Sequence, residues 1–123
     1  NQVDDMIELI KSFGIKVGIS INPTTDANLV LPYLSKIDQL LLMSVEPGMG
    51  GQEYIDINDK IQLVSEYITK HKLNTIISVD GGMNLETLKP IKDYVGMVVM
   101  GSYISNSKNP VKTINDVKTV NVK

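Results

Sequence analysis

Cysteine and arginine are absent from the 123-residue chain, and histidine occurs once. The lack of cysteine excludes disulfides, thiol nucleophiles and thiolate metal sites, and it is compatible with a reducing compartment. All 12 basic residues are lysines, so a bound phosphate would be held by backbone amides, helix N-termini or lysine. Without cysteine, and with its one histidine at a helix end, this chain alone could build a metal site only from carboxylates and water.

The charge and the apolar runs exclude further classes of function. A net charge of −2 gives no electrostatic basis for binding nucleic acid or an anionic membrane surface. No apolar run is long enough to cross a bilayer, and the polar, acidic start of the chain is not typical of a signal peptide. We therefore expect a cytoplasmic protein with no nucleic-acid or membrane partner.

Apolar runs and amphipathic stretches alternate along the chain. Strands are predicted at 16–21, 39–45, 75–79 and 97–100, and helices at about 4–13, 25–34, 57–71, 84–93 and from 110 onward. This alternation with short connections predicts an α/β fold whose parallel sheet is built from right-handed crossovers. Four strands fit a small flavodoxin-like sandwich or half of a barrel, and periodicity does not separate the two. A whole (β/α)8 barrel needs roughly 200 residues, so we interpret the chain as a piece of a longer protein.

Small residues follow three of the predicted strands within three positions. They are Gly48, Gly50 and Gly51 after the second strand, Gly81 and Gly82 after the third, and Gly101 and Ser102 after the fourth. The carboxyl ends of parallel strands are where such sheets bind ligands, and successive glycine amides can converge on an anion. Each glycine could equally serve a tight turn. Three such strand ends together favour one phosphate-bearing substrate.

Asp80 is the acid among these strand ends. A carboxylate there can act as a general base, a metal ligand or both; the alternative is an aspartate that caps the following turn. Met43, near the end of the second strand, could cover a small active site or pack in the core. His71 ends a helix, at the opposite edge of a parallel sheet, and is a poor catalytic candidate.

Three segments resemble one known family, the ribulose-phosphate 3-epimerases. They are Met43-Ser44-Val45-Glu46-Pro47-Gly48-Met49-Gly50-Gly51-Gln52, Val79-Asp80-Gly81-Gly82 with Asn84, and Gly101-Ser102. Residues 18–25 also look like the fifth strand and loop of these enzymes. The resemblance implies a TIM (β/α)8 barrel of the ribulose-phosphate-binding type. Residues 1–123 would be the C-terminal half of this single domain, with the last four strands, and the N-terminal half would not be in this sequence.

The resemblance also implies a reaction. The family interconverts D-ribulose 5-phosphate and D-xylulose 5-phosphate, in the pentose phosphate pathway, by two-base proton transfer at carbon 3 through an enediolate. A divalent metal cation (Zn, Fe, Mn or Co) assists. Asp80 would be the second catalytic aspartate and a metal ligand. The substrate-binding residues would be Met43, Gly48, Met49, Gly50, Gly51, Asp80, Gly81, Gly82, Gly101 and Ser102.

The sequence departs from the family pattern at two positions, and two other functions are alternatives to the epimerase. Met49 stands where the family usually has phenylalanine, and Tyr103 follows the Gly-Ser pair where a small residue is usual. An epimerase for a ketohexose 6-phosphate and a non-catalytic phosphate-binding half-barrel are the alternatives. We expect the isolated piece to be inactive, and its two sheet edges and inward apolar layers to favour association. The full-length protein is expected to be a homo-oligomer.

Overall fold

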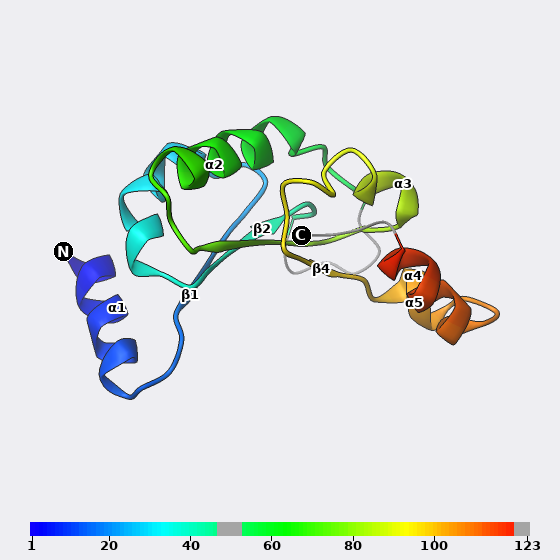
Figure 1. Ribbon diagram of the computed structural model, residues 1–123, viewed down its shortest axis with the longest axis horizontal. Coiled ribbons are helices and arrows are strands. Elements are labelled where there is room, and N and C mark those ends of the chain that lie inside the picture. Colours follow the sequence, from blue (N-terminus) through cyan, green and yellow to red (C-terminus); the bar gives the residue numbers. More distant parts are fainter. Residues whose placement is uncertain (47–52, 120–123) are drawn as a thin grey trace.

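One four-stranded parallel sheet organises the protein (Figure 1). The computed structural model describes residues 1–46 and 53–119. The strands lie side by side in chain order: β1 (Gly18–Ile21), β2 (Gln39–Met43), β3 (Ile76–Asp80) and β4 (Met97–Val99). All three neighbouring pairs are parallel, which confirms the predicted sheet.

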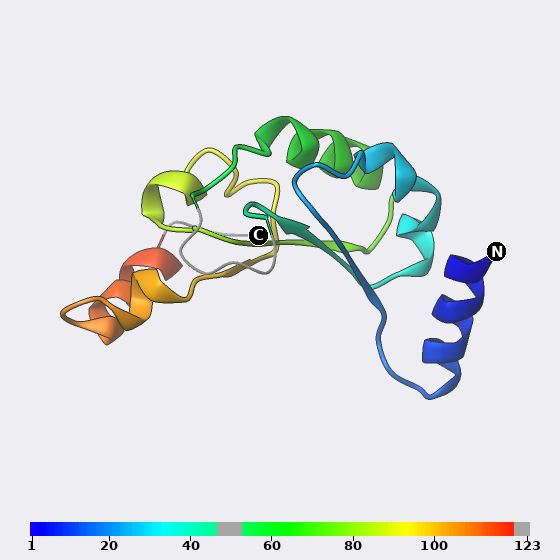
Figure 2. The same ribbon diagram turned by 180° about the vertical axis from the view of Figure 1, so that it is seen from behind.

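Helices fill the connections and the ends of the described chain. They are α1 (Gln2–Ser12), the 3₁₀ helices η1 (Ala27–Leu29) and η2 (Leu31–Lys36), α2 (Asn58–Lys70), α3 (Leu85–Leu88), α4 (Ser102–Ser105) and α5 (Pro110–Lys118). Both ribbon views show α2 and the 3₁₀ helices over one face of an arched sheet, with α1 at one end and α4 and α5 at the other (Figures 1 and 2). None of the helices in the described residues is long and apolar enough to cross a membrane.

The helix predicted at 84–93 is wrong in length. It ends at Leu88 because Pro90 has no N–H to continue the helical bonding, and the chain proceeds in turns. The predicted helix at 25–34 is instead the pair of 3₁₀ helices, and α4 was not predicted. At the first helix, Asn1 and not an aspartate provides the cap: its side-chain oxygen accepts the Asp4 N–H at 2.8 Å.

The two faces of the sheet differ sharply in burial. Side chains under the helices are fully buried or nearly so: Leu40, Leu42, Ile77 and Val79. Side chains on the opposite face, which we call the open face, include large exposed hydrophobic groups: Ile76 (47%), Met97 (47%) and Val99 (42%). Near-continuous apolar strands are typical of a sheet that is covered on both faces. In this structure the helices cover only one face.

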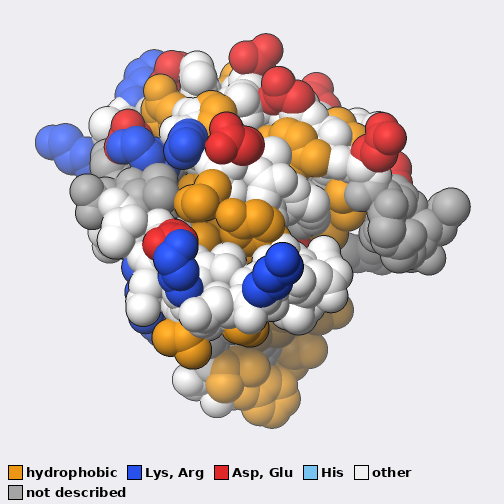
Figure 3. Space-filling model, turned by 90° about the vertical axis from the view of Figure 1, so that its right-hand side faces the viewer, with side chains coloured by type: hydrophobic (Ala, Val, Ile, Leu, Met, Phe, Trp, Pro, Cys, Tyr) orange, Lys and Arg blue, Asp and Glu red, His pale blue; other side chains and the backbone are white. Residues whose placement is uncertain are grey.

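The arrangement is a partial TIM barrel. Four strand–helix units follow one another along the chain, with α2 and the 3₁₀ helices on the outer face, and the alternate side chains on the open face correspond to the layers that fill a barrel interior. Within the described residues, β1 and β4 each pair with a single neighbour and form the two sheet edges. Figure 3 looks at the end that carries α3, α4 and α5, where hydrophobic side chains gather between charged ones.

Candidate functional site

The carboxyl ends of β2, β3 and β4 place Asp80 in a row of three side chains. Met43 and Val99 are its register partners on the two neighbouring strands. Register partners in parallel strands point to the same face, so all three belong to the open face. Asp80 and Met43 are half-buried. The row thus sets one carboxylate between two apolar side chains at the mouth of the partial barrel.

A cavity of about 380 Å³ lies beside this row. Its lining residues come from the ends of β3 and β4 and the segments that follow: Asp80, Gly82, Met83, Asn84, Val99, Gly101, Ser102 and Tyr103. Four of the residues predicted from the sequence, Asp80, Gly82, Gly101 and Ser102, therefore meet in one cavity. Tyr103 lines the same cavity, so the departure noted in the sequence lies at the candidate site.

The turn after β3 needs both of its glycines. Gly81 has a φ of +119°, and a Cβ atom there would lie 2.7 Å from Val45 Cγ2 and 2.9 Å from the Val45 nitrogen. Gly82 has a φ of +65°, and a Cβ atom would lie 3.1 Å from Tyr54 Cβ. The positive φ values disfavour side chains at both positions, and at Gly81 the neighbouring chain also approaches too closely to admit one. Gly81 shapes the end of β3, although it is not among the residues that line the cavity.

Ser44 joins the ends of β2 and β3, and the sequence analysis missed it. Its side chain is fully buried. Its N–H donates to the Asp80 carbonyl oxygen at 2.8 Å, and its hydroxyl lies within hydrogen-bond distance of the Asp80 and Gly81 carbonyl oxygens. A lone hydroxyl between Met43 and Val45, in an apolar run, is the sequence signal that could have identified it.

Asn84 organises the chain beyond the glycines. Its side-chain oxygen accepts the Thr87 N–H at 3.0 Å, and the Thr87 hydroxyl accepts the Asn84 N–H at 2.8 Å. This reciprocal capping box starts α3 next to the cavity. Asn84 therefore has a structural task at the site whether or not it contacts a ligand.

Two further side chains support neighbouring strand ends. Burial, followed by the negative charge of Asp56, raises the pKa of Tyr54, which packs against Gly82. Lys60 on α2 donates to the carbonyl oxygens of Asn22 at 3.1 Å and Pro23 at 2.7 Å, just beyond β1. Partial burial lowers the pKa of Lys60. The loop after β1 is thus tied to the helix that follows β2.

The described residues do not by themselves make a metal site. Nowhere in 1–46 and 53–119 do three or more His, Cys, Asp or Glu side chains cluster as metal ligands would. His71 caps the C-terminal end of α2, with its ring centroid 4.1 Å from that of Tyr67, and the chain then enters β3 from the opposite edge. Asp80 is the candidate ligand that lines the cavity beside β3.

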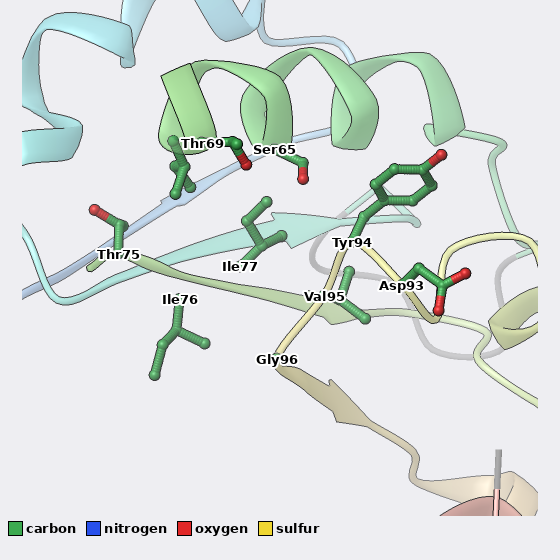
Figure 4. A pocket seen from close by; sticks show the side chains of 10 residues that line it. Ser65, Thr69, Thr75, Ile76, Ile77, Asp93, Tyr94, Val95 and Gly96 are labelled. Atoms are coloured by element: carbon green, nitrogen blue, oxygen red, sulfur yellow. The ribbon is translucent and has the colours of Figure 1, made fainter. Parts of the chain in front are cut away.

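A second cavity, of about 280 Å³, lies at the amino-terminal ends of β3 and β4, opposite the carboxyl ends that carry Asp80 (Figure 4). It is bounded by the C-terminal half of α2, the start of β3 around Thr75 and the turn before β4 that contains Asp93 and Tyr94. Ligands of parallel α/β folds bind at the carboxyl edge, and none of the predicted site residues lines this cavity. The cavity beside Asp80 is therefore the candidate functional site.

Four of the predicted site residues, Gly48, Met49, Gly50 and Gly51, lie outside the described residues. Met43 is placed beside Asp80 in the register and does not line the cavity. The structure thus brings together the residues predicted on β3 and β4, with Met43 adjoining them from β2.

Comparisons with known proteins agree with the predicted resemblance. The sequence model of the ribulose-phosphate 3 epimerase family matches residues 1–105. A ribulose-phosphate 3-epimerase from Buchnera aphidicola subsp. Baizongia pistaciae is 44% identical over 122 residues, covering 98% of this chain and 54% of the relative. One from Helicobacter pylori strain J99 is 37% identical over 117 residues, covering 94% and 54%.

A solved structure from Aquifex aeolicus VF5 has a similar fold, with a TM-score of 0.54 at 16% sequence identity. The match covers 97% of this chain and 43% of that one. The chain spans about half the length of the curated relatives it matches. From its sequence motifs, its partial barrel and these matches, the chain belongs to the ribulose-phosphate 3-epimerase family.

Proposed function

We propose that this chain is the C-terminal half of an epimerase barrel that interconverts D-ribulose 5-phosphate and D-xylulose 5-phosphate. The N-terminal half of the domain, outside this sequence, would supply the other strands. One observation carries the proposal: the Asp80 carboxylate shares a cavity with Gly82, Gly101 and Ser102 at the carboxyl edge of the sheet. An acid–base group and small residues suited to an anion thus lie at one mouth.

Asp80 would transfer the proton at carbon 3 of the sugar. That proton is acidic because carbon 3 adjoins the carbonyl at carbon 2, so its removal gives an enediolate. A positioned carboxylate can take or return such a proton by general acid–base catalysis. Inversion needs proton transfer on opposite faces of carbon 3, so the second base would come from the other half of the barrel. Met43 and Val99 flank Asp80 in the register and would limit water around the reacting carbon.

The phosphate would lie against the ends of β3 and β4. Gly82, Gly101 and Ser102 line the cavity there, and the short helix α4 begins at Ser102. In TIM barrels the loops after the last two strands and the N-terminus of a short extra helix frequently bind phosphate. The absence of arginine fits a site of backbone amides and a hydroxyl.

Metal assistance remains part of the proposal. A divalent cation would act as a Lewis acid in the reaction, and Asp80 would be the ligand contributed by this chain. The described residues do not form a metal site alone, so no step is assigned to a cation here. The pentose phosphate pathway, a cytoplasmic location and homo-oligomerisation of the full-length protein belong to the same proposal.

The test is proton exchange at carbon 3. The complete barrel containing these residues is incubated with ribulose 5-phosphate and a divalent metal in deuterated water, and the carbon-3 proton is followed by NMR. Asp80→Asn should abolish both exchange and xylulose 5-phosphate formation. Asp93→Asn is the matched control and should retain activity. It removes a carboxylate at the amino-terminal ends of the strands, away from Asp80, where Asp93 Oδ1 lies 3.2 Å from Lys92 Nζ.

The outcomes separate the alternatives. Exchange with a ketohexose 6-phosphate but not with the pentose would replace the proposed substrate. Phosphate binding in a folded, metal-loaded barrel without exchange on either sugar would leave the non-catalytic half-barrel. Equal activity of Asp80→Asn and the parent would refute the assignment of Asp80.

A further inference from the structure

Ser44 sits at the point where β2 and β3 end together. It follows the last residue of β2 and is fully buried. Most of its neighbours in this run are apolar, yet its hydroxyl is used: the Oγ atom lies 3.0 Å from the Asp80 carbonyl oxygen and still closer to that of Gly81. With one proton, the hydroxyl donates to one of these oxygens at a time. The buried Ser44 hydroxyl therefore hydrogen-bonds to the main chain of Asp80 or of Gly81.

The main chain of Ser44 makes two more bonds at this point. Its N–H donates to the Asp80 carbonyl oxygen at 2.8 Å, and its own carbonyl oxygen accepts the Ile55 N–H at 2.6 Å. Ser44 thus links three stretches of chain: the end of β2, the end of β3 and the segment that leads into α2. Gly81 makes the junction tight, because its Cα approaches the Ser44–Val45 backbone where no Cβ atom would fit.

We propose that the Ser44 hydroxyl is a positioning group for Asp80. By donating to the carbonyl oxygen of Asp80 or of Gly81, it restrains the two peptide groups that follow the Asp80 Cα atom, and so the backbone from which the Asp80 side chain projects. A carboxylate that must meet one proton in one direction depends on such alignment, since small displacements of a reacting group lower rates steeply. This inference rests on the proposed function of Asp80, and it assigns Ser44 no contact with the substrate.

Thr75 provides a matched control. Its hydroxyl is also buried and also bonds to main-chain carbonyls, with Oγ1 2.5 Å from the Leu34 oxygen and 3.5 Å from that of Ile37. It lies just before β3, at the other end of the strand from Asp80. Ser44→Ala and Thr75→Val each remove one such hydroxyl and keep the main-chain bonds. The two variants should lose similar conformational stability, because each leaves buried carbonyl groups with one donor fewer.

The experiment uses the complete barrel in its metal-loaded form. Ser44→Ala should lower kcat by roughly 10- to 100-fold with KM within about two-fold of the parent, because the binding groups remain while the base is misaligned. Thr75→Val should leave both constants near those of the parent. Ser44→Cys keeps a weak donor in a similar volume and should give an intermediate kcat, so the series remains informative if the alanine variant folds poorly.

A second readout does not need activity. The carbonyl ¹³C shifts of Asp80 and Gly81, measured by NMR, should change in Ser44→Ala and remain unchanged in Thr75→Val. Unchanged shifts in Ser44→Ala, an unchanged kcat, or an equal loss of kcat in the Thr75 control would each overturn the positioning role. If the parent barrel has no epimerase activity, the proposed function fails, and the carbonyl shifts alone then decide whether Ser44 holds Asp80.

Discussion

Met43 and Asp80 are register partners on β2 and β3, so their side chains leave adjacent strands on the same face of the sheet. Val99 continues the row on β4. The pairing sets the proposed base against apolar neighbours at the carboxyl edge, while the glycines and Ser102 line the adjoining cavity. Asp80 therefore has cavity-lining polar groups on one side and apolar side chains beside it in the sheet.

Gly81→Ala should destabilise the protein by about 2–4 kcal/mol. The new Cβ atom would lie 2.7 Å from Val45 Cγ2 and 2.9 Å from the Val45 nitrogen, at a φ of +119°. Gly101→Ala is the matched control because a Cβ atom there has no neighbour within 4 Å, and it should change stability by less than about 0.5 kcal/mol. Urea unfolding followed by circular dichroism measures both; equal effects would contradict the steric account.

Asn84→Ala should destabilise the protein by about 1 kcal/mol, because it removes the oxygen that accepts the Thr87 N–H at the start of α3. Glu86→Ala, in the same short helix, removes only an exposed ion pair with Lys89 at 3.6 Å and should cost less than about 0.5 kcal/mol. The same unfolding measurement applies. A larger loss in Glu86→Ala than in Asn84→Ala would show that the capping box is not what holds the helix.

Tyr54 should make the folded state sensitive to alkaline pH. Its pKa is raised in the folded protein, chiefly by burial, so the folded state holds the phenolic proton more tightly than the unfolded chain does. Its contribution to stability is complete below the unfolded value of about 10 and is lost as the pH rises through the folded pKa.

Tyr54→Phe should therefore lose less stability than the parent as the pH rises above about 10. Urea unfolding over this pH range gives the comparison, and spectrophotometric titration of the two proteins isolates the contribution of Tyr54. Tyr103→Phe is the control, since it removes a different phenol at the candidate cavity. Parallel pH profiles for the parent and Tyr54→Phe would contradict the assignment.

Many of the strands, turns and helix starts of this protein could be predicted from local patterns in its sequence. Apolar runs predicted the four strands, because buried parallel strands need few polar side chains along their length, and the small residues after three of them predicted the edge where they end. The helix start at Asn84 and the turn at Gly81 and Gly82 are also set by local residue types. The structure has Asn84 as the cap of α3 and both glycines at positive φ. Asp80 was the acid predicted to carry the chemistry, because two glycines follow it at the end of a buried strand. The family resemblance of the same segments agrees with the comparisons.

Tertiary structure decided the rest. The sequence does not state the register that puts Met43 beside Asp80, nor that helices cover one face of the sheet and leave Ile76 and Met97 exposed on the other. It also gave no role to Ser44, whose hydroxyl reaches residues 36 and 37 positions away in the chain. Helix caps and turns are set by residues close together in the chain, so they can be predicted from a short stretch of sequence. Register, burial and such distant hydrogen bonds exist only after the strands pack together, because they depend on which distant backbones meet.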